Sequence, residues 1–194
     1  MKAFSSSRNI EKFRPALFLD RDGVINLNHG YVHKIENFNF LPEIFDLLSL
    51  ANERGYLVIV ITNQAGIGRG LYSDEQFNKL TIWMVERFKE RNITIDGVFY
   101  SPFHPIHGIG KYLLKENTRK PGSGMFEEAF KYFQIIKSNS IMIGDNITDL
   151  EASNKAGIKN NLLLDSNKIN SNKSDSLDNF DIISSLSEAK DFIK

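Results

Sequence analysis

The sequence predicts an α/β fold in which a doubly wound parallel sheet carries helices on both faces. Short apolar runs of strand length alternate along the chain with amphipathic stretches of helical period. This alternation is typical of βαβ units, whose strands lie parallel because a helix crosses back between them. At 194 residues the chain is long enough for one domain with a sizeable core. We therefore expect residues 1–194 to form a single domain.

Each predicted strand is a short run of apolar residues bounded by turn formers. In chain order the strands are residues 16–19, 57–62, 97–100, 140–143 and 161–164, with a weaker one at 180–183. The predicted helices occupy residues 42–54, 73–91, 125–133, 148–156 and 186–192. The second helix has a clear start, because Ser73 and Gln76 have the spacing of a capping box.

Two connections are too long for tight turns. Residues 26–41 follow the first strand, and residues 101–121 form a long loop without helical period. Long loops inside compact domains are often functional, so both are candidates to border a site. Residues 165–178 are rich in Asn, Ser, Lys and Asp and predict a mobile surface loop.

The composition limits the classes of function. The formal net charge is +0, so no overall field attracts nucleic acid or a membrane. The chain has no cysteine, which excludes disulfides, thiolate metal ligands and cysteine nucleophiles. Neither a signal peptide nor a transmembrane span is recognisable. We expect a cytoplasmic monomer that binds neither nucleic acid nor membrane.

A pair of carboxylates at the end of the first predicted strand is the most informative feature. Asp20 and Asp22 follow the apolar run, and Gly23 comes next. Side chains two residues apart on a strand share a face. The two acids can therefore converge on one point, hold a hard cation, and divide the roles of nucleophile and acid/base. The plainer interpretation is a strand that ends in an Asp-Gly turn.

Two further segments carry groups that bind anions. Thr62 ends the second strand before the glycine-rich residues 63–70, where its hydroxyl and backbone N–H groups could bind phosphate oxygens. This is not a P-loop, because Gly-Lys-Ser/Thr is missing. Lys120 can neutralise a phosphoryl group, and Arg119 can bind a second anion bidentately. Alone, the first segment indicates only a strand-to-helix loop and the second a solvated surface pair.

The third segment is acidic and follows the strand that ends at Ile143. Asp145 would bind a cation directly, and Asp149 would bind it through water or orient the site, although Asp149 could also only cap the helix. Ligands of parallel sheets bind at the carboxyl ends of the strands, where these residues fall. Three aspartates predict Mg²⁺. Asp20 is the natural nucleophile, because no Ser-His-Asp or Cys-His arrangement is evident.

Taken in chain order, these segments resemble the four motifs of the haloacid dehalogenase superfamily. The motifs are Asp20-x-Asp22-Gly, Thr62-Asn63, Lys120-Pro121 and Gly144-Asp145-x-x-x-Asp149. Within that superfamily, residues 20–26, 29–33, 62–70 and 119–121 look like the heptose 1,7-bisphosphate 7-phosphatases, with the histidinol phosphatases as near relatives. The resemblance covers roughly residues 16–164. It implies a Rossmann-like core with minimal cap loops and a role in making surface polysaccharide (lipopolysaccharide) precursors.

The resemblance also implies a mechanism that removes the 7-phosphate of D-glycero-D-manno-heptose 1,7-bisphosphate. Asp20 would become an aspartyl phosphate, and Asp22 would protonate the leaving oxygen and then activate water. Mg²⁺ would be held by Asp20, Asp145 and the Asp22 carbonyl, while Thr62 and Lys120 would stabilise the phosphoryl oxygens. The phosphorylated sugar would contact Asn28, His29, Gly30, Tyr31, Asn63, Gln64, Ala65, Arg119 and Asn146.

One departure from the resemblance concerns a second metal. In the heptose enzymes the loop before Arg119 usually binds zinc through a Cys-x-His and a Cys-x-Cys pair. Here those positions are Ser101, Phe103, Glu116 and Thr118. We expect no zinc, although His104 and His107 with Glu116 could in principle hold a metal. Other contacts, for which packing of Phe103 is one candidate, would then replace the stabilisation that zinc supplies.

Two alternative functions stay open at this point. A phosphatase for histidinol phosphate or another small phosphomonoester would use the same motifs near the metal. A receiver-like module, phosphorylated on Asp20 without turnover, would share the α/β plan and an Asp-Thr-Lys set. Asp22 argues against the second alternative, because it supplies the acid/base that turnover needs.

Overall fold

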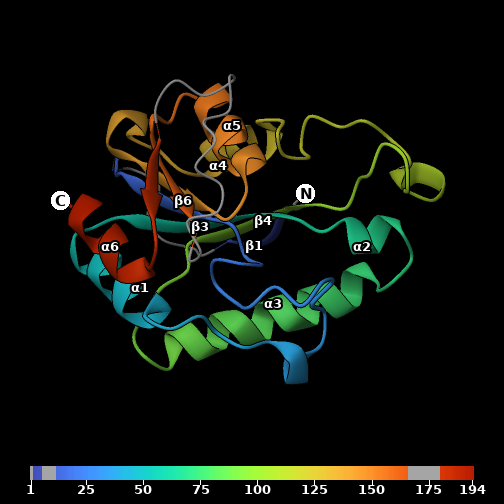
Figure 1. Ribbon diagram of the computed structural model, residues 1–194, viewed down its shortest axis with the longest axis horizontal. Helices are drawn as coiled ribbons and strands as arrows, with labels where there is room; N and C mark the ends of the chain where they lie inside the picture. Colours follow the sequence, from blue (N-terminus) through green and yellow to red (C-terminus); the bar gives the residue numbers. More distant parts are fainter. Residues whose placement is uncertain (1, 6–11, 166–179) are drawn as a thin grey trace.

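The computed structural model describes residues 2–5, 12–165 and 180–194 (Figure 1). Within them, one seven-stranded sheet has the order β1-β4-β3-β2-β5-β6-β7. The strands are β1 (Lys2–Ser5), β2 (Ala16–Leu19), β3 (Leu57–Asn63), β4 (Gly97–Ser101), β5 (Ile141–Gly144), β6 (Asn160–Leu164) and β7 (Asp181–Ile183). β1 is antiparallel to β4, and every other neighbouring pair is parallel. The predicted doubly wound α/β fold is confirmed.

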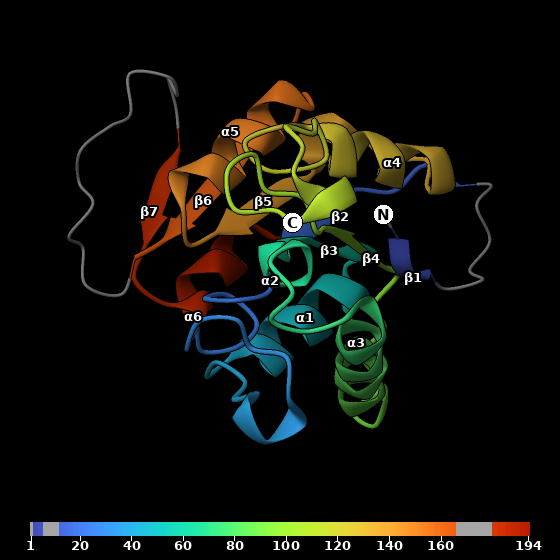
Figure 2. The ribbon, with the colours of Figure 1, turned by 90° about the vertical axis from the view of Figure 1, so that its right-hand side faces the viewer.

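Helices cover both faces of the sheet (Figure 2). On one face lie α1 (Ile44–Glu53), α3 (Asp74–Lys89) and α6 (Leu186–Ala189), and on the other lie α4 (Gly124–Tyr132) and α5 (Ile147–Lys155). The central strands β2 and β5 are buried along their whole length. This burial on both faces explains why their sequences are continuous apolar runs and do not alternate with polar residues.

The core is divided by the sheet into two layers. Leu17 and Leu19 of β2 pack in the layer that contains the buried residues of α1 and α3. Phe18 points to the other layer, where its ring centroid lies 4.9 Å from that of Phe126 in α4. Both layers hold β2 in place, so the residue that follows the strand, Asp20, starts from a rigid position.

Helix α3 is an example of an element whose start and buried face agree with the sequence. Ser73 Oγ accepts a hydrogen bond from the Gln76 N–H at 3.1 Å, and Gln76 Oε1 accepts one from the Ser73 N–H at 2.8 Å. This confirms the predicted capping box. The residues at helical spacing on one side of α3 are fully or almost fully buried, namely Phe77, Leu80, Met84 and Phe88.

The predicted elements are all found, with ends that shift by one or two residues, but two elements escaped prediction. β1 is a short edge strand, and α2 (Ala65–Gly68) is a single helical turn inside the glycine-rich segment. The predicted helix 186–192 ends as an α-helix at Ala189 and continues as a 3₁₀ turn, Lys190–Phe192. Other 3₁₀ turns are Ile35–Asn37, Gly110–Tyr112 and Lys137–Asn139. The predicted surface loop 165–178 lies, apart from Asp165, outside the described residues.

None of the helices in the described ranges has both the length and the apolar character that a membrane crossing requires. The two long loops, 26–41 and 101–121, follow β2 and β4 and so begin at the carboxyl edge of the parallel strands. That edge is where an open α/β sheet binds its ligands.

Candidate active site

A cavity of about 500 Å³ lies at the carboxyl edge of the sheet. Asp20 enters it directly after β2, Asn63 from the end of β3, and Asp145 directly after β5. Both long loops contribute to the wall. The predicted site residues that line the cavity are Asp20, Asp22, Asn28, Gly30, Tyr31, Asn63, Gln64, Ala65, Arg119, Lys120, Asp145, Asn146 and Asp149.

The floor of the cavity is built around the buried ammonium of Lys120. Its Nζ lies 3.0 Å from Asp20 Oδ1 and 2.7 Å from Asp149 Oδ1, and it donates a hydrogen bond to the Ile61 carbonyl at 2.9 Å. The Lys120 side chain is 1% exposed. Its three partners together use the three N–H donors of an ammonium group, so the charge is fixed in one place.

The backbone of Lys120 is fixed as firmly as its side chain. Asn63 Oδ1 accepts from the Lys120 N–H at 3.0 Å, and Asn63 Nδ2 donates to the Lys120 carbonyl at 3.2 Å. A single amide therefore binds both polar groups of one residue across the cavity floor. This gives Asn63, which we expected to contact substrate, a structural role as well.

Several carboxylates are crowded around this one ammonium. Burial raises the pKa of Asp20 to about 7; Lys120 opposes the shift, and Asp149, Asp145 and Asp22 add to it. Burial likewise raises the pKa of Asp145 to about 6, with Asp149 adding to the rise. For Lys120, burial alone would lower the pKa, but Asp149 and Asp20 outweigh it and the net direction is upward. The site thus holds more negative charge than its lysine neutralises.

One oxygen from each of Asp20, Asp145 and Asp149 lies within 4.8 Å of the others. Glycine at two positions makes this approach possible. A Cβ on Gly23, whose φ is +92°, would lie 2.0 Å from Asp145 Oδ2. A Cβ on Gly144 would lie 2.4 Å from the Cβ of Asp149. Both distances are far shorter than atoms tolerate, so a side chain at either position would push a carboxylate out of the cluster.

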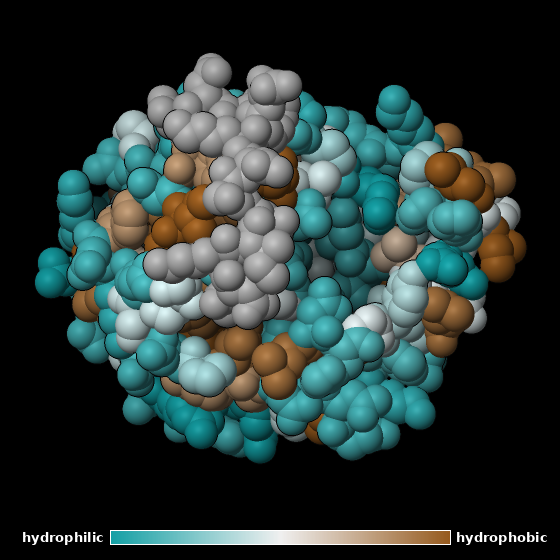
Figure 3. Space-filling view, viewed as in Figure 1, coloured by the Kyte–Doolittle hydropathy of each residue, from teal (hydrophilic) through white to brown (hydrophobic). Residues whose placement is uncertain are grey.

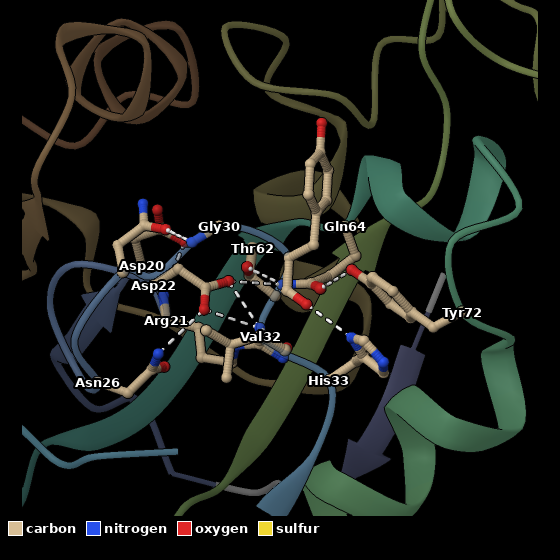
Figure 4. A network of polar contacts seen from close by, with 12 residues as sticks. Asp20, Arg21, Asp22, Asn26, Gly30, Val32, His33, Thr62, Gln64 and Tyr72 are labelled. Atoms are coloured by element: carbon tan, nitrogen blue, oxygen red, sulfur yellow. Dashed lines mark hydrogen bonds and ion pairs between the residues drawn. The ribbon is translucent and has the colours of Figure 1, made fainter. Parts of the chain in front are cut away.

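Asp22 lies at the centre of a second network of polar contacts (Figure 4). Arg21 Nη2 donates to Asp22 Oδ1 and Oδ2 at 2.8 and 2.7 Å. Asn26 Nδ2 donates to Oδ1 and Gln64 Nε2 to Oδ2, both at 3.0 Å. With donors on both oxygens, the carboxylate has one defined orientation beside Asp20.

Two of these donors, Gln64 and Arg21, are themselves held in place by other residues. Gln64 Nε2 also donates to Thr62 Oγ1 at 2.9 Å, and Gln64 Oε1 accepts from the Tyr72 hydroxyl at 2.6 Å. Arg21 is 1% exposed, donates to the Val32 carbonyl at 2.6 Å, and lies beneath the ring of Phe77, 5.6 Å from its centroid. Sequence reasoning missed both Arg21 and Tyr72. The only local signal was a basic residue between two acids of the motif.

The structure does not place every expected residue in the cavity. Thr62 is buried beneath it and does not line the wall, and its hydroxyl accepts from Gln64. His29 is exposed and lies outside the lining. Residues that line the cavity without having been predicted to do so are Arg69, Tyr72, His104 and Thr148. Arg69 Nη1 donates to the Tyr31 hydroxyl, so this pair links the end of α2 to the long loop that follows β2.

At the positions where the heptose enzymes usually bind zinc, this chain has direct contacts between side chains. Ser101 Oγ and Thr118 Oγ1 lie 3.3 Å apart, within hydrogen-bond distance, and the Phe103 ring centroid lies 5.9 Å from that of Tyr112. His104 Nδ1 accepts from two backbone N–H groups of its own turn. Within the described residues, His104 is not part of a cluster of three potential metal ligands. The absence of zinc remains a prediction.

The fold and the site together define a hydrolase of the haloacid dehalogenase type. A family model described as HAD-hydrolase-like matches residues 117–189, which include Lys120, Asp145 and Asp149. Among solved structures, a D,D-heptose 1,7-bisphosphate phosphatase from B. bronchiseptica, complexed with magnesium and phosphate, superposes with a TM-score of 0.76. It is 21% identical, with 91% of this chain and 96% of that chain covered.

Similarity to curated proteins narrows the class further. The chain is 48% identical over 149 residues to D-glycero-alpha-D-manno-heptose-1,7-bisphosphate 7-phosphatase of Burkholderia mallei, covering 77% of this chain and 79% of the relative. It is 43% identical over 155 residues to the beta-anomer enzyme of Vibrio cholerae, covering 80% and 83%. The chain belongs to the family of D-glycero-D-manno-heptose-1,7-bisphosphate 7-phosphatases. It is therefore a phosphoric monoester hydrolase, and the receiver-like alternative is not supported.

Proposed function

We propose that the protein removes the 7-phosphate of D-glycero-D-manno-heptose 1,7-bisphosphate, with Mg²⁺ and through an aspartyl-phosphate intermediate. The observation that carries this proposal is the convergence of Asp20, Asp145 and Asp149 around the buried Lys120 at the cavity floor. The names of the curated relatives support the substrate. The magnesium and phosphate in the B. bronchiseptica structure support the metal and the reaction.

The carboxylate cluster suits a divalent cation in two respects. Its donors are hard oxygens, which Mg²⁺ prefers, and its negative charge exceeds what Lys120 neutralises. Asp20 and Asp145 would hold the ion. Asp149 already accepts from Lys120 through Oδ1 and from the Asn146 N–H through Oδ2, so it would act through Lys120 or a water. Bound Mg²⁺ would offset the repulsion between a carboxylate and an incoming phosphate.

Asp20 would attack phosphorus in line. Its Oδ1 accepts from the Arg21 N–H at 2.7 Å and lies 3.0 Å from Lys120 Nζ. These contacts leave Oδ2 as the attacking atom. A bond would form from this oxygen to phosphorus while the bond from phosphorus to the sugar oxygen breaks. Lys120 would neutralise the charge on the phosphoryl oxygens throughout the transfer.

Asp22 would act as a general acid in the first step and as a general base in the second. In the first step its carboxylic acid form gives a proton to the sugar oxygen that leaves. In the second step its carboxylate takes a proton from the water that attacks phosphorus and frees Asp20. The donors from Arg21, Asn26 and Gln64 fix the direction of its carboxyl group.

The rim of the cavity supplies a second place for an anion. Arg119 precedes Lys120 in the sequence and, like His104, lines the cavity. Its planar guanidinium suits bidentate binding of a phosphate. A substrate with two phosphates could place one over Asp20 and the other at Arg119, which favours a sugar bisphosphate over a monophosphate.

The experiment is phosphate release measured for α- and β-heptose 1,7-bisphosphate and for histidinol phosphate. We expect the highest kcat/KM with a heptose bisphosphate. A higher kcat/KM for histidinol phosphate would show that the protein is the alternative enzyme, a histidinol-phosphate phosphatase.

The Asp20→Asn variant should lose turnover about 10⁴-fold or more, because the nucleophile is gone, and still bind substrate. Asp46→Asn, at an exposed aspartate of α1, is the control; comparable turnover in Asp20→Asn would exclude Asp20 as the nucleophile.

A further inference from the structure

Residues 102–118, here called the rim loop, border the cavity without a core of their own. The loop places His104 in the cavity wall and leads directly into Arg119. Its large apolar side chains point mostly to solvent, and Ile106 and Ile109 are 73% and 65% exposed. Figure 3 shows hydrophobic side chains gathered on the projection that this loop forms. A segment with so little apolar burial depends on specific polar contacts for its position.

Tyr112 holds the rim loop through its side chain, beside backbone hydrogen bonds such as the one from the Ile109 N–H to the Gly68 carbonyl at 2.7 Å. Its hydroxyl donates to Asp74 Oδ2 at 2.7 Å. Its carbonyl accepts from the His104 N–H at 3.1 Å, and its ring packs against Phe103. A Cβ on Gly68 would lie 2.9 Å from the Tyr112 Cβ, so the loop also lies directly against α2. Tyr112 thus connects the start of the loop, at Phe103 and His104, to α3 through Asp74 and lies against α2.

Asp74 provides a firm point of attachment. It is the first residue of α3, where the helix dipole stabilises a carboxylate. Its other oxygen, Oδ1, accepts from the Tyr100 hydroxyl at 2.7 Å. Tyr100 belongs to β4, is 5% exposed, and packs its ring 4.5 Å from that of Phe77. The two oxygens of one carboxylate therefore join the rim loop, through Tyr112, to the sheet and to α3.

The attachment extends from Tyr112 to the guanidinium of Arg119. Arg119 Nη1 donates to the Phe103 carbonyl at 3.3 Å, and Phe103 is the residue whose ring packs on Tyr112. If the Tyr112 hydroxyl lost its partner, Phe103 would be the first residue to move. Its carbonyl would then no longer hold Arg119 in a fixed direction.

We propose that Tyr112 and Asp74 are positioning residues for recognition of the second phosphate. Neither lines the cavity. Their hydrogen bond helps to fix the rim loop, and the Phe103 carbonyl of that loop directs the Arg119 guanidinium in the cavity wall. The inference rests on the proposed function, because it assigns Arg119 to the phosphate that is not transferred. It predicts an effect on substrate binding that is separate from the chemistry at Asp20.

The test uses Tyr112→Phe, which removes one hydroxyl and keeps the ring. We expect KM for heptose 1,7-bisphosphate to rise about tenfold with kcat nearly unchanged, since a hydrogen bond to a charged group is lost outside the reacting centre. Activity toward p-nitrophenyl phosphate, which has no second phosphate, should stay within about twofold. An unchanged KM for the bisphosphate, or an equal loss with both substrates, would overturn the inference.

Tyr100→Phe is the matched control, because it removes the other hydroxyl from the same carboxylate and leaves the bond from Tyr112 in place. We expect it to lower the melting temperature at least as much as Tyr112→Phe while KM rises less than about twofold. A merely structural role for Asp74 would instead make KM follow the melting temperature in both variants.

A double-mutant cycle with Arg119→Ala completes the test. Once Arg119 is absent, Tyr112→Phe should raise KM no further, because its effect passes through that guanidinium. A tenfold rise that persists in the Arg119→Ala background would contradict the inference. A wild-type protein that does not prefer the bisphosphate to the monophosphate would overturn the proposed function, and the inference with it, in a measurement made before any variant is used.

Discussion

The floor and the rim of the cavity are held in place by different means. At the floor, Asp20 and Asp145 each follow a strand that is buried on both faces, and Lys120 is fixed by three partners of its ammonium group. At the rim, the Arg119 guanidinium donates to the Phe103 carbonyl of a mostly exposed loop, which Tyr112 and a few other hydrogen bonds hold. The floor is therefore rigid because of the core beneath it, whereas the rim is only as rigid as a few hydrogen bonds.

This difference separates two properties of the enzyme. A buried, rigid floor preorganises charge for phosphoryl transfer and can serve any small phosphomonoester. A rim built from loops can change its shape without disturbing the floor, and under the proposed function it would decide which sugar fits. Enzymes named for the alpha and for the beta anomer are both more than 40% identical to the chain.

Among the variants that compare the floor with the rim, the largest effect is expected from removing the ammonium group of Lys120. Lys120→Ala leaves Asp20 and Asp149 buried and facing each other without the ammonium that lies between them. We expect kcat to fall about 10³-fold, because the charge that stabilises the phosphoryl oxygens is lost. Unlike the rim variant, it should affect heptose bisphosphate and p-nitrophenyl phosphate equally. The measurement is steady-state phosphate release with both substrates.

Lys155→Ala is the control for that experiment. Lys155 donates to the Pro121 carbonyl, next to Lys120 in the chain, but lies outside the cavity lining. Its loss should change kcat less than about twofold, as for other exposed charges. If Lys120→Ala instead raised only the KM for the bisphosphate, the floor and the rim would not be functionally separate.

A smaller effect is expected from Gly23→Ala, which adds a side chain next to Asp145, a proposed ligand of Mg²⁺. Gly23→Ala places a Cβ 2.0 Å from Asp145 Oδ2, so Asp145 must move. We expect the Mg²⁺ concentration needed for half-maximal activity to rise about 10- to 100-fold, the usual cost of disturbing a metal ligand. The measurement is activity against Mg²⁺ concentration.

Gly55→Ala separates this contact from backbone strain. Gly55 has a φ of +82°, close to the +92° of Gly23, but a Cβ there meets no atom within 4 Å. Both variants should lose the stability that the strained φ costs, Gly23→Ala should lose more because of the contact with Asp145, and only Gly23→Ala should change the Mg²⁺ requirement. A similar change in both would mean that the strain, and not the position of Asp145, controls the metal.

The division between floor and rim also explains what the sequence could predict. Asp20, Lys120 and Asp145 were recognisable because each stands beside a strand or in a short motif, and parallel strands bring their ends to one edge. The contact between Tyr112 and Asp74 joins residues 38 positions apart through a loop without regular structure. No local pattern in the sequence predicts a contact of this kind.

The departures from expectation at the floor have physical reasons too. Thr62 was expected to stabilise phosphoryl oxygens, which stays a prediction, and in this structure its hydroxyl accepts a hydrogen bond from Gln64 and Thr62 does not line the cavity. Arg21 was not singled out, because a lone arginine is usually solvated, and here Asp22 and the Val32 carbonyl hold it inside the protein. α2 escaped prediction, because two of its four residues are glycine, a poor helix former.

The smallest expected effect is on the stability of the protein. The stabilisation that Mg²⁺ gives at two pH values can be compared between floor and rim variants. Burial raises the pKa of Asp20 to about 7 and of Asp145 to about 6. Because the folded state holds these protons more tightly than the unfolded state, the two groups make the metal-free protein less stable as pH rises from about 4 to about 7. Mg²⁺ competes with the same protons. Its stabilisation should therefore be small at pH 5.5 and grow to about 2–3 kcal/mol at pH 8 with saturating Mg²⁺.

Thermal melting with and without Mg²⁺ at the two pH values measures this effect. At pH 8, Mg²⁺ should raise the melting temperature of the wild type and of Tyr112→Phe by the same few degrees, since the rim loop does not contact the carboxylate cluster. Gly23→Ala should show a smaller rise. A Mg²⁺ shift that is equal at both pH values would show that the buried carboxyls do not control metal binding. A shift that disappears in Tyr112→Phe would show that the floor and the rim are one coupled unit.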